Sequence, residues 1–329
     1  MRTDGTVPRF MRAVAIDAFG GPERLVGREL RVPEVDRHEV LIRVDTAGVG
    51  IWDAKMRRGA FSRGKSFPLV LGAEGSGTIA SLGDDVQGLS VGDAVIGYAY
   101  GDRKGGFYAE YVALKAEHVA PMPRSLDFRE AGPIPVAGLT ALAGIDDALG
   151  LRAGTTVLIH GAAGSVGVMA VQLAKRRGAR VVATARDREG VELLRRLGAD
   201  AAIDAQHDDV LAVTRGVVPN GVDAVLALAG GPGLERIVAA LRDGGTIARP
   251  NGVELPNDIV GIAFDGVPNP AAFARLTAAI DEAPFEVPIA AMYSLDDTAD
   301  AHRRLERGRV HGTIVVVVDA TEDALEEVA

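Results

Sequence analysis

The stretch Val157-Leu-Ile-His-Gly161-Ala-Ala-Gly164-Ser-Val-Gly167 joins a short apolar run to three glycines. An apolar-periodic segment, Val168-Met-Ala-Val-Gln-Leu-Ala-Lys175, follows it, and a second apolar run covers residues 180–185. This order predicts a strand, a glycine turn, a helix and a second strand. The glycines allow a tight turn, a close approach of the backbone to a pyrophosphate and close helix packing, while the helix N-terminus favours the phosphate charge. The stretch therefore predicts a dinucleotide site that uses Gly161, Ala163, Gly164, Ser165, Val166 and Gly167.

The end of the second predicted strand indicates which dinucleotide binds. An acidic residue there would bind the ribose hydroxyl of NAD, but this chain has Thr184-Ala-Arg186-Asp187-Arg188. Guanidinium groups form bidentate, charge-assisted hydrogen bonds with phosphate, so Arg186 and Arg188 favour NADP. The alternative is that both arginines are solvated at the start of a helix that Asp187 caps. NADPH is therefore the expected cofactor, with NADH as the alternative.

Composition excludes several classes of function. The chain has 329 residues, which suggests two domains, and a formal net charge of −9, which disfavours binding to nucleic acid. It has no cysteine, so disulfides, thiolate zinc sites and cysteine nucleophiles are excluded. The N-terminus has no apolar signal core, and no apolar run is long enough to span a membrane. We expect a soluble cytoplasmic protein without membrane partners.

The pattern of elements changes along the chain. Residues 11–135 contain short strand-like segments separated by glycine turns, which is typical of a small β-barrel. Residues 136–281 alternate helices with apolar strands, and the strands number six, as in a complete dinucleotide-binding sheet; the last of them is expected at Ile259–Ala263. Residues 282–318 end in the apolar run Thr313–Val318, which is expected to rejoin the barrel, and residues 319–329 form an acidic tail.

Motifs along nearly the whole chain resemble those of the medium-chain dehydrogenase/reductase superfamily. They include Val70-Leu-Gly-Ala-Glu-Gly-Ser-Gly77, Gly106-Phe-Tyr-Ala-Glu-Tyr-Val112, Gly138-Leu-Thr-Ala141 and Gly164-Ser-Val-Gly167. The most similar branch is that of the zinc-free quinone oxidoreductases and related NADPH-dependent alkene reductases. The resemblance implies an α/β fold, with a GroES-like β-barrel catalytic domain and an inserted six-stranded parallel Rossmann domain. It also implies cofactor contacts from Thr140, Thr184, Asn251, Ala263 and Phe264.

The resemblance also bears on metal binding. Zinc alcohol dehydrogenases carry a cysteine and a histidine at positions that match Gly50 and Ala73, and neither of these residues can bind a metal. We therefore expect no metal site. The six histidines (His38, His118, His160, His207, His302 and His311) are scattered, which favours structural or solvated roles.

Hydride transfer to a quinone or an α,β-unsaturated carbonyl needs no metal. Two polar residues that the resemblance would lead us to expect are missing. Quinone oxidoreductases usually carry an asparagine at the position of Gly50, and related enoyl reductases carry a tyrosine at the position of Phe61. Gly50 is expected to leave open space for a flat acceptor. Trp52 could stack on that acceptor or pack in the barrel, and Tyr98 or Tyr100 could donate to its oxygen or lie at the surface.

Three further expectations complete the interpretation. We expect Asp53 to have a structural role, and we expect Arg57 and Arg58 to be solvated. The apolar strand Ile259–Ala263 would leave an exposed sheet edge, which predicts a homodimer. The missing polar residues keep two alternatives open, namely a tailoring enoyl reductase of a specialised metabolite and a catalytically weak nucleotide-sensing or scaffold protein.

Overall fold

The computed structural model describes residues 2–3, 7–60, 66–231, 233–256 and 259–319, which divide into two compact units. Unit 1 comprises Met1–Val136, Pro268–Pro284 and Ile289–Ala329, and unit 2 comprises Ala137–Val267 and Phe285–Pro288. The division assigns helix α8 (Pro270–Asp281) to unit 1. The domain boundaries after residues 135 and 281 stay predictions. Within the described residues, no helix combines the length and apolar character needed to cross a membrane.

Unit 2 is built on a parallel sheet that has six strands in the described part of the chain. The strands are β10 (Thr156–His160), β11 (Arg180–Ala185), β12 (Ala201–Asp204), β13 (Val222–Ala227), β14 (Leu241–Pro250) and β15 (Ile262–Phe264). Their order is β12-β11-β10-β13-β14-β15, so the chain reverses its direction of travel across the sheet beside β10. The six-stranded parallel fold is confirmed. The last strand begins at Ile262, not at the expected Ile259, because its pairing with β14 starts at Ala248↔Ile262.

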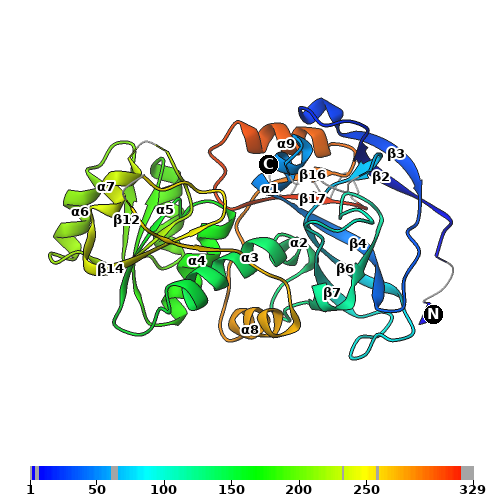
Figure 1. Ribbon diagram of the computed structural model, residues 1–329, viewed down its shortest axis with the longest axis horizontal. Helices are drawn as coiled ribbons and strands as arrows, with labels where there is room; N and C mark the ends of the chain where they lie inside the picture. Colours follow the sequence, from blue (N-terminus) through cyan, green and yellow to red (C-terminus); the bar gives the residue numbers. More distant parts are fainter. Residues whose placement is uncertain (1, 4–6, 61–65, 232, 257–258, 320–329) are drawn as a thin grey trace. The chain divides into compact units, whose positions relative to one another are not determined.

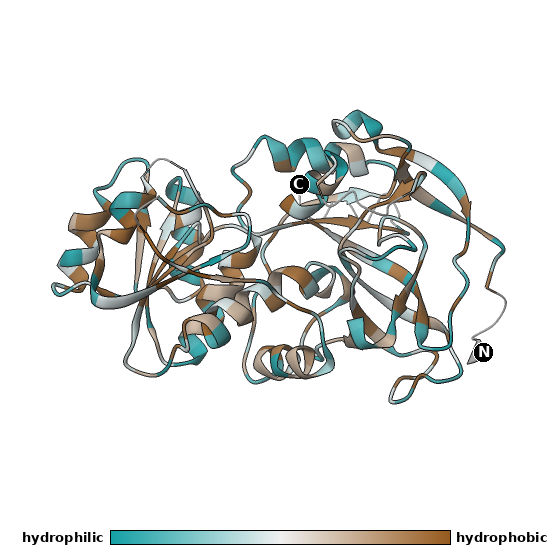
Figure 2. Ribbon diagram, in the orientation of Figure 1, coloured by the Kyte–Doolittle hydropathy of each residue, from teal (hydrophilic) through white to brown (hydrophobic). Residues whose placement is uncertain are grey.

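The central strand of this sheet is apolar because both of its faces are covered. Val157, Leu158 and Ile159 of β10 are fully buried, as expected for a parallel strand between two layers of helices. Figure 2 shows the strands of the sheet mainly in the brown of hydrophobic residues. The glycine turn follows directly after this buried strand.

Helices and short helical segments surround the sheet of unit 2, drawn in green and yellow in Figure 1. They are α3 (Pro135–Leu142), the π-helix η3 (Ala143–Ala148), α4 (Ser165–Arg176), α5 (Arg188–Arg196), α6 (Val210–Val217) and α7 (Leu234–Val238). Helix α4 is buried from Gly167 to Ala174, and its one buried amide side chain, Gln172, bonds to both backbone groups of Glu286. The buried helix therefore holds its N-terminus in a fixed place beside β10.

Unit 1 is mainly antiparallel. Its larger sheet contains β1 (Arg2–Thr3), β4 (Glu39–Val49), β6 (Glu74–Leu82), β7 (Ala94–Tyr98), β8 (Tyr111–Lys115), β9 (Val119–Pro121), β16 (Ile289–Ser294) and β17 (Thr313–Val317). A smaller sheet contains β2 (Phe10–Ile16), β3 (Val26–Arg31) and β5 (Leu69–Val70). The helical segments are α1 (Ile51–Arg57), α2 (Phe128–Ala131), α9 (Thr298–Glu306), η1 (Pro22–Arg24) and η2 (Ala116–His118), besides α8.

Strand β4 is the central strand of the larger sheet in unit 1 and leads directly into helix α1. It pairs with β6, β8 and the C-terminal strand β17, whose Ile314 lies opposite Val49. Beneath β6, Phe107 is fully buried, and a Cβ atom at Gly75 would lie 2.3 Å from its ring. Glycine at this position therefore makes room for the aromatic core.

Candidate active site

The turn between β10 and α4 gives its three glycines different environments. Gly161 has φ of +77°, a conformation that glycine adopts without strain. At Gly167 a Cβ atom would lie 2.4 Å from the Ala162 carbonyl oxygen, so only glycine lets α4 pack this closely. At Gly164, the N-cap of α4, a Cβ atom would meet nothing nearer than the Gly161 oxygen at 3.7 Å. The turn is tight at one end, closely packed at the other and open between them, which suits a pyrophosphate.

The carboxyl ends of the parallel strands bring distant residues of unit 2 to one edge of the sheet. The Leu228 amide donates to the His160 carbonyl oxygen at 3.0 Å, and the Ala162 amide donates to the Thr184 carbonyl oxygen at 3.0 Å. At the far strands, the Asn251 amide donates to the Phe264 carbonyl oxygen at 3.0 Å. The loops after β10, β11, β13, β14 and β15 therefore share the edge where such sheets bind ligands.

The Thr184 side chain holds the glycine turn. Its hydroxyl lies 2.9 Å from His160 Nδ1 and accepts a hydrogen bond from the Gly161 amide at 3.2 Å. Burial, and then the nearby Arg186 guanidinium, lower the pKa of His160 to about 4. A neutral His160 and the Thr184 hydroxyl therefore support the shape of the turn, in keeping with the structural role expected of the histidine.

The two arginines after β11 have different surroundings. The Arg188 side chain is 92% exposed, and its Nε lies 2.9 Å from Glu192 Oε1 on the surface of α5. Asp187 caps the same helix, because its Oδ1 accepts from the Gly190 amide at 2.9 Å. Arg186 is exposed and forms no hydrogen bond or ion pair with the residues that the structure describes. Arg186 is therefore the arginine that is available for an anionic group at this edge.

The remaining predicted cofactor residues lie on the same unit. Asn251 Nδ2 donates to Asp265 Oδ2 at 2.5 Å. Gly266, just beyond β15, passes so close to α3 that a Cβ atom there would lie 2.5 Å from the Thr140 amide nitrogen. The structure thus places Thr140 and Asn251 beside the segment that carries Ala263 and Phe264.

In unit 1, Gly50 and Trp52 form the start of α1, but the space beside Gly50 is not open. A Cβ atom at position 50 would lie 2.0 Å from Trp52 Cε2 and 2.5 Å from its Nε1. The expectation of open space is wrong, because the indole ring packs over the glycine. The Trp52 Nε1 is buried and has no hydrogen-bond partner among the described residues.

The other residues that were predicted to contact the hydride acceptor differ in their burial. Tyr98 is buried in β7, and its ring contacts that of Tyr100 edge-on, with centroids 6.4 Å apart. Tyr100 is partly buried and packs against the core of unit 1. Phe61 lies outside the described residues. Tyr98 is therefore a core residue, so the alternative of a surface position does not apply to it.

Helix α1 carries a buried carboxyl group at its start. Asp53 Oδ2 accepts from the Gly50 amide and Oδ1 accepts from the Ala73 amide, both at 2.9 Å. Burial raises the pKa of Asp53 to about 7, while hydrogen bonds from the Gly50 and Ala73 amides and the Tyr108 hydroxyl oppose this rise. Asp53 therefore joins the start of α1 to the strand that follows Leu71–Gly72.

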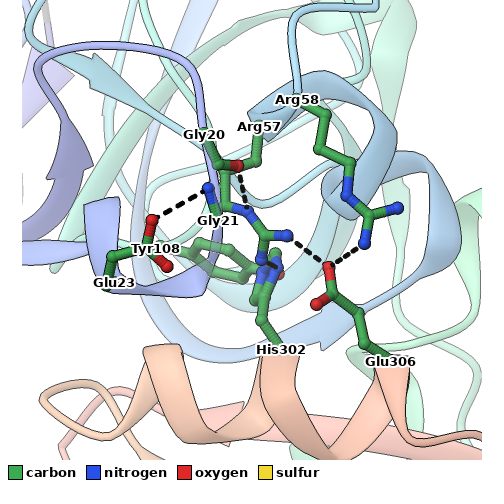
Figure 3. A network of polar contacts seen from close by, with 8 residues as sticks. All are labelled: Gly20, Gly21, Glu23, Arg57, Arg58, Tyr108, His302 and Glu306. Atoms are coloured by element: carbon green, nitrogen blue, oxygen red, sulfur yellow. Dashed lines mark hydrogen bonds and ion pairs between the residues drawn. The ribbon is translucent and has the colours of Figure 1, made fainter.

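One turn later on the same helix, Arg57 is fully buried, so the expectation that it is solvated is wrong. Its Nη1 lies 2.9 Å from His302 Nδ1, its Nε donates to the Gly20 carbonyl oxygen at 3.1 Å, and it forms an ion pair with Glu306 (Figure 3). His302 Nε2 in turn lies 3.1 Å from the Tyr108 hydroxyl. Arg58 is exposed, as expected, and its Nη2 lies 2.9 Å from Glu306 Oε1. The sequence offered one signal for this network, the four-residue spacing of Asp53 and Arg57 on one helix face.

The residues of unit 1 do not fit a zinc site of the alcohol dehydrogenase kind. Gly50 and Ala73 have no donor atoms, and the chain has no cysteine. The adjacent carboxylate, Glu74, is buried and accepts from the Val136 amide at 2.6 Å. Across the described residues, no three His, Cys, Asp or Glu side chains converge as metal ligands.

Comparisons with known proteins agree with this architecture. Residues 165–250 match the family model of the zinc-binding dehydrogenases, and residues 36–124 match that of the alcohol dehydrogenase GroES-like domain. The quinone oxidoreductase of Mus musculus is 32% identical over 74% of this chain and 73% of its own length. The chloroplastic NADPH-dependent alkenal/one oxidoreductase of Arabidopsis thaliana is 30% identical over 95% of this chain and 81% of its own length. The solved structure of an NAD-dependent alcohol dehydrogenase is 32% identical, with a TM-score of 0.87 over 94% of this chain and 100% of that chain.

These matches confirm the GroES-like and Rossmann-like fold that the motifs predicted. The family models cover residues 36–124 of unit 1 and, in unit 2, the segment from the start of helix α4 to the end of strand β14. The chain is therefore an oxidoreductase of the medium-chain dehydrogenase/reductase superfamily, in its quinone oxidoreductase-like branch.

Proposed function

We propose that this protein is an NADPH-dependent, zinc-independent reductase of quinones or α,β-unsaturated carbonyl compounds. The observation that carries the proposal is the edge of unit 2, where an open glycine turn lies beside the unpaired Arg186. The quinone and alkenal/one oxidoreductases among its relatives support the class of acceptor.

The residues at this edge fit a dinucleotide. The turn Gly161–Gly167 offers an open, amide-lined approach for the pyrophosphate, which contacts at Ala163, Ser165 and Val166 would complete. Arg186 would bind the 2′-phosphate of NADPH. Arg188 contributes less, because it already pairs with Glu192. Thr140, Asn251, Ala263 and Phe264 would hold the nicotinamide end of the cofactor.

When bound, NADPH supplies the hydride. A quinone or an enone accepts a hydride without a Lewis acid, because its conjugated system carries the developing charge to oxygen. Oxidation of a simple alcohol in the way of the zinc alcohol dehydrogenases needs a metal to stabilise the alkoxide charge, and Gly50 and Ala73 provide no ligand for one. The chemistry of these positions thus favours reduction of an activated double bond, although one structural relative is an NAD-dependent alcohol dehydrogenase.

We also propose a homodimer. Strand β15 is at the edge of its sheet, and the segment around it exposes large apolar side chains: Val260 is 95% exposed, Ile262 45% and Val267 63%. An apolar strand edge of this kind is suited to pairing with a second copy of the chain. The cytoplasmic location stays a prediction.

Steady-state assays test the function. We expect the purified protein to oxidise NADPH with 1,4-benzoquinone or 2-cyclohexen-1-one, equally well with and without EDTA. Cyclohexanone, which lacks the conjugated double bond, is the matched control and should not react. Turnover that requires zinc, or that is faster with cyclohexanone than with either conjugated acceptor, would contradict the proposal.

A further inference from the structure

The buried network of unit 1 has a direction that Arg57 determines. A guanidinium group has only donors, so Arg57 Nη1 must donate to His302 Nδ1, which is 2.9 Å away. Nδ1 is then the unprotonated nitrogen of the neutral ring, and Nε2 carries the proton. Nε2 must donate to the Tyr108 oxygen at 3.1 Å, which leaves the Tyr108 proton for its interaction with the Asp53 carboxyl group.

The chain of hydrogen bonds from Arg57 therefore ends at Asp53, which accepts hydrogen bonds in its other contacts as well. The Asp53 oxygens accept from the Gly50 and Ala73 amides. Arg57, His302, Tyr108 and Asp53 are all fully buried, so water does not compete for these bonds. Because Arg57 does not release its proton, this chain of hydrogen bonds cannot conduct protons from the surface. Its effect is to orient Asp53.

What Asp53 orients is the loop at the start of α1. Its carboxyl group holds the Gly50 amide, and the Trp52 indole packs directly on Gly50. Arg57 fixes the other end of the helix to α9 through His302 and Glu306, as Figure 3 shows. Both ends of α1 are thus anchored to partners that are distant in the sequence.

We propose that Tyr108 and His302 are positioning residues, which act through Asp53 to hold the loop Gly50–Trp52 in place for the acceptor. This inference rests on the proposed function, since it assumes that the acceptor binds at this loop. The direction of this hydrogen-bond chain makes the inference specific, because His302 and Tyr108 must each accept one hydrogen bond and donate another in the stated order. A substitution that keeps this order should preserve the loop, and one that interrupts it should not.

Tyr108→Phe removes one hydroxyl and interrupts the chain, while Tyr111→Phe, in neighbouring β8, is the matched control. The protein has one tryptophan, so the indole N–H resonance of Trp52 is a single, assigned signal in a nitrogen-15 spectrum. We expect Tyr108→Phe to shift this resonance and Tyr111→Phe to leave it unchanged. We further expect kcat with 2-cyclohexen-1-one to fall at least about tenfold in Tyr108→Phe, while the Kd for NADPH changes less than about threefold.

A second pair of variants tests the direction. His302→Gln retains an amide donor and a carbonyl acceptor, and should keep most of the turnover, whereas His302→Leu should lose it. An unchanged Trp52 resonance in Tyr108→Phe, or equal turnover in His302→Gln and His302→Leu, would overturn the inference. Equal losses of NADPH affinity and turnover would also overturn it, since they indicate a general structural role. If the wild-type protein reduces neither acceptor, the proposed function fails, whereas the Trp52 resonance still tests the positioning.

Discussion

Replacing Arg186 with alanine should reverse the preference for NADPH. Arg186 has no partner among the described residues, so it can bind a 2′-phosphate without giving up an existing ion pair. Hydrogen bonds to charged groups contribute about 1.5–3 kcal/mol, and each 1.4 kcal/mol corresponds to about tenfold in affinity. We therefore expect Arg186→Ala to raise the Kd for NADPH about 10- to 100-fold while the Kd for NADH changes little.

Arg188→Ala is the matched control. Arg188 is 92% exposed and bonds to Glu192, so a contact between it and the 2′-phosphate would be a solvent-exposed ion pair, and such pairs contribute about 0–1 kcal/mol. The Kd for NADPH should therefore rise less than about fivefold in this variant. The wild type and both variants are titrated with each dinucleotide, and the quenching of the single tryptophan or calorimetry gives the six dissociation constants. If Arg186→Ala keeps the NADPH preference, or if Arg188→Ala loses as much affinity, the assignment of the phosphate site to Arg186 is refuted.

We expect four further outcomes, three for the buried network of unit 1 and one for the sheet edge of unit 2. Arg57→Leu should lower the free energy of unfolding of unit 1 by about 3–5 kcal/mol, because it leaves buried partners of the guanidinium unpaired. Urea titration with Trp52 fluorescence measures this loss, and a loss below about 1 kcal/mol would contradict the buried network. Burial raises the pKa of Asp53 from 3.8 to about 7, so its contribution to stability is lost as the pH rises through this range, and the stability of wild type relative to Asp53→Asn should fall from pH 4 to 7. Burial and Arg57 lower the pKa of His302 from 6.5 to about 3, so wild type relative to His302→Gln should instead gain stability as the pH rises over that range; the same slope for both pairs would show that one pKa shift has the wrong sign. Ile262→Lys should convert the proposed dimer to a monomer in light scattering, while Val213→Lys on α6, a similarly exposed position at 39%, should not, and a monomeric wild type would exclude the dimer.

Local patterns predicted the part of the site that lies on consecutive residues. The turn Gly161–Gly167 and the arginines after β11 each belong to one strand–turn–helix segment, in which backbone geometry and helix termini depend on nearby residues. The same logic identified Asp187 as a helix cap. The pairing of Arg188 with Glu192 is local as well, because the two residues are four positions apart on helix α5.

The loop Gly50–Trp52 and helix α1 show where local patterns are insufficient. Glycine at position 50 suggested open space, yet the Trp52 ring packs over it, because a side chain's rotamer depends on everything around it. Arg57 looked like a solvated residue of an exposed turn. Its position in the core depends on His302, which is 245 residues away along the chain.

The residues of this chain were sufficient to indicate a six-stranded parallel sheet and the glycine turn between strand β10 and helix α4, since strand periodicity and glycine spacing are properties of short segments. The tertiary structure settled the rest: what covers Gly50 and which buried groups hold Asp53 and Arg57. The physical reason is that burying a charged group is favourable only when hydrogen-bonding partners meet it, and in this protein those partners come from β-strand loops and a helix far apart in the sequence.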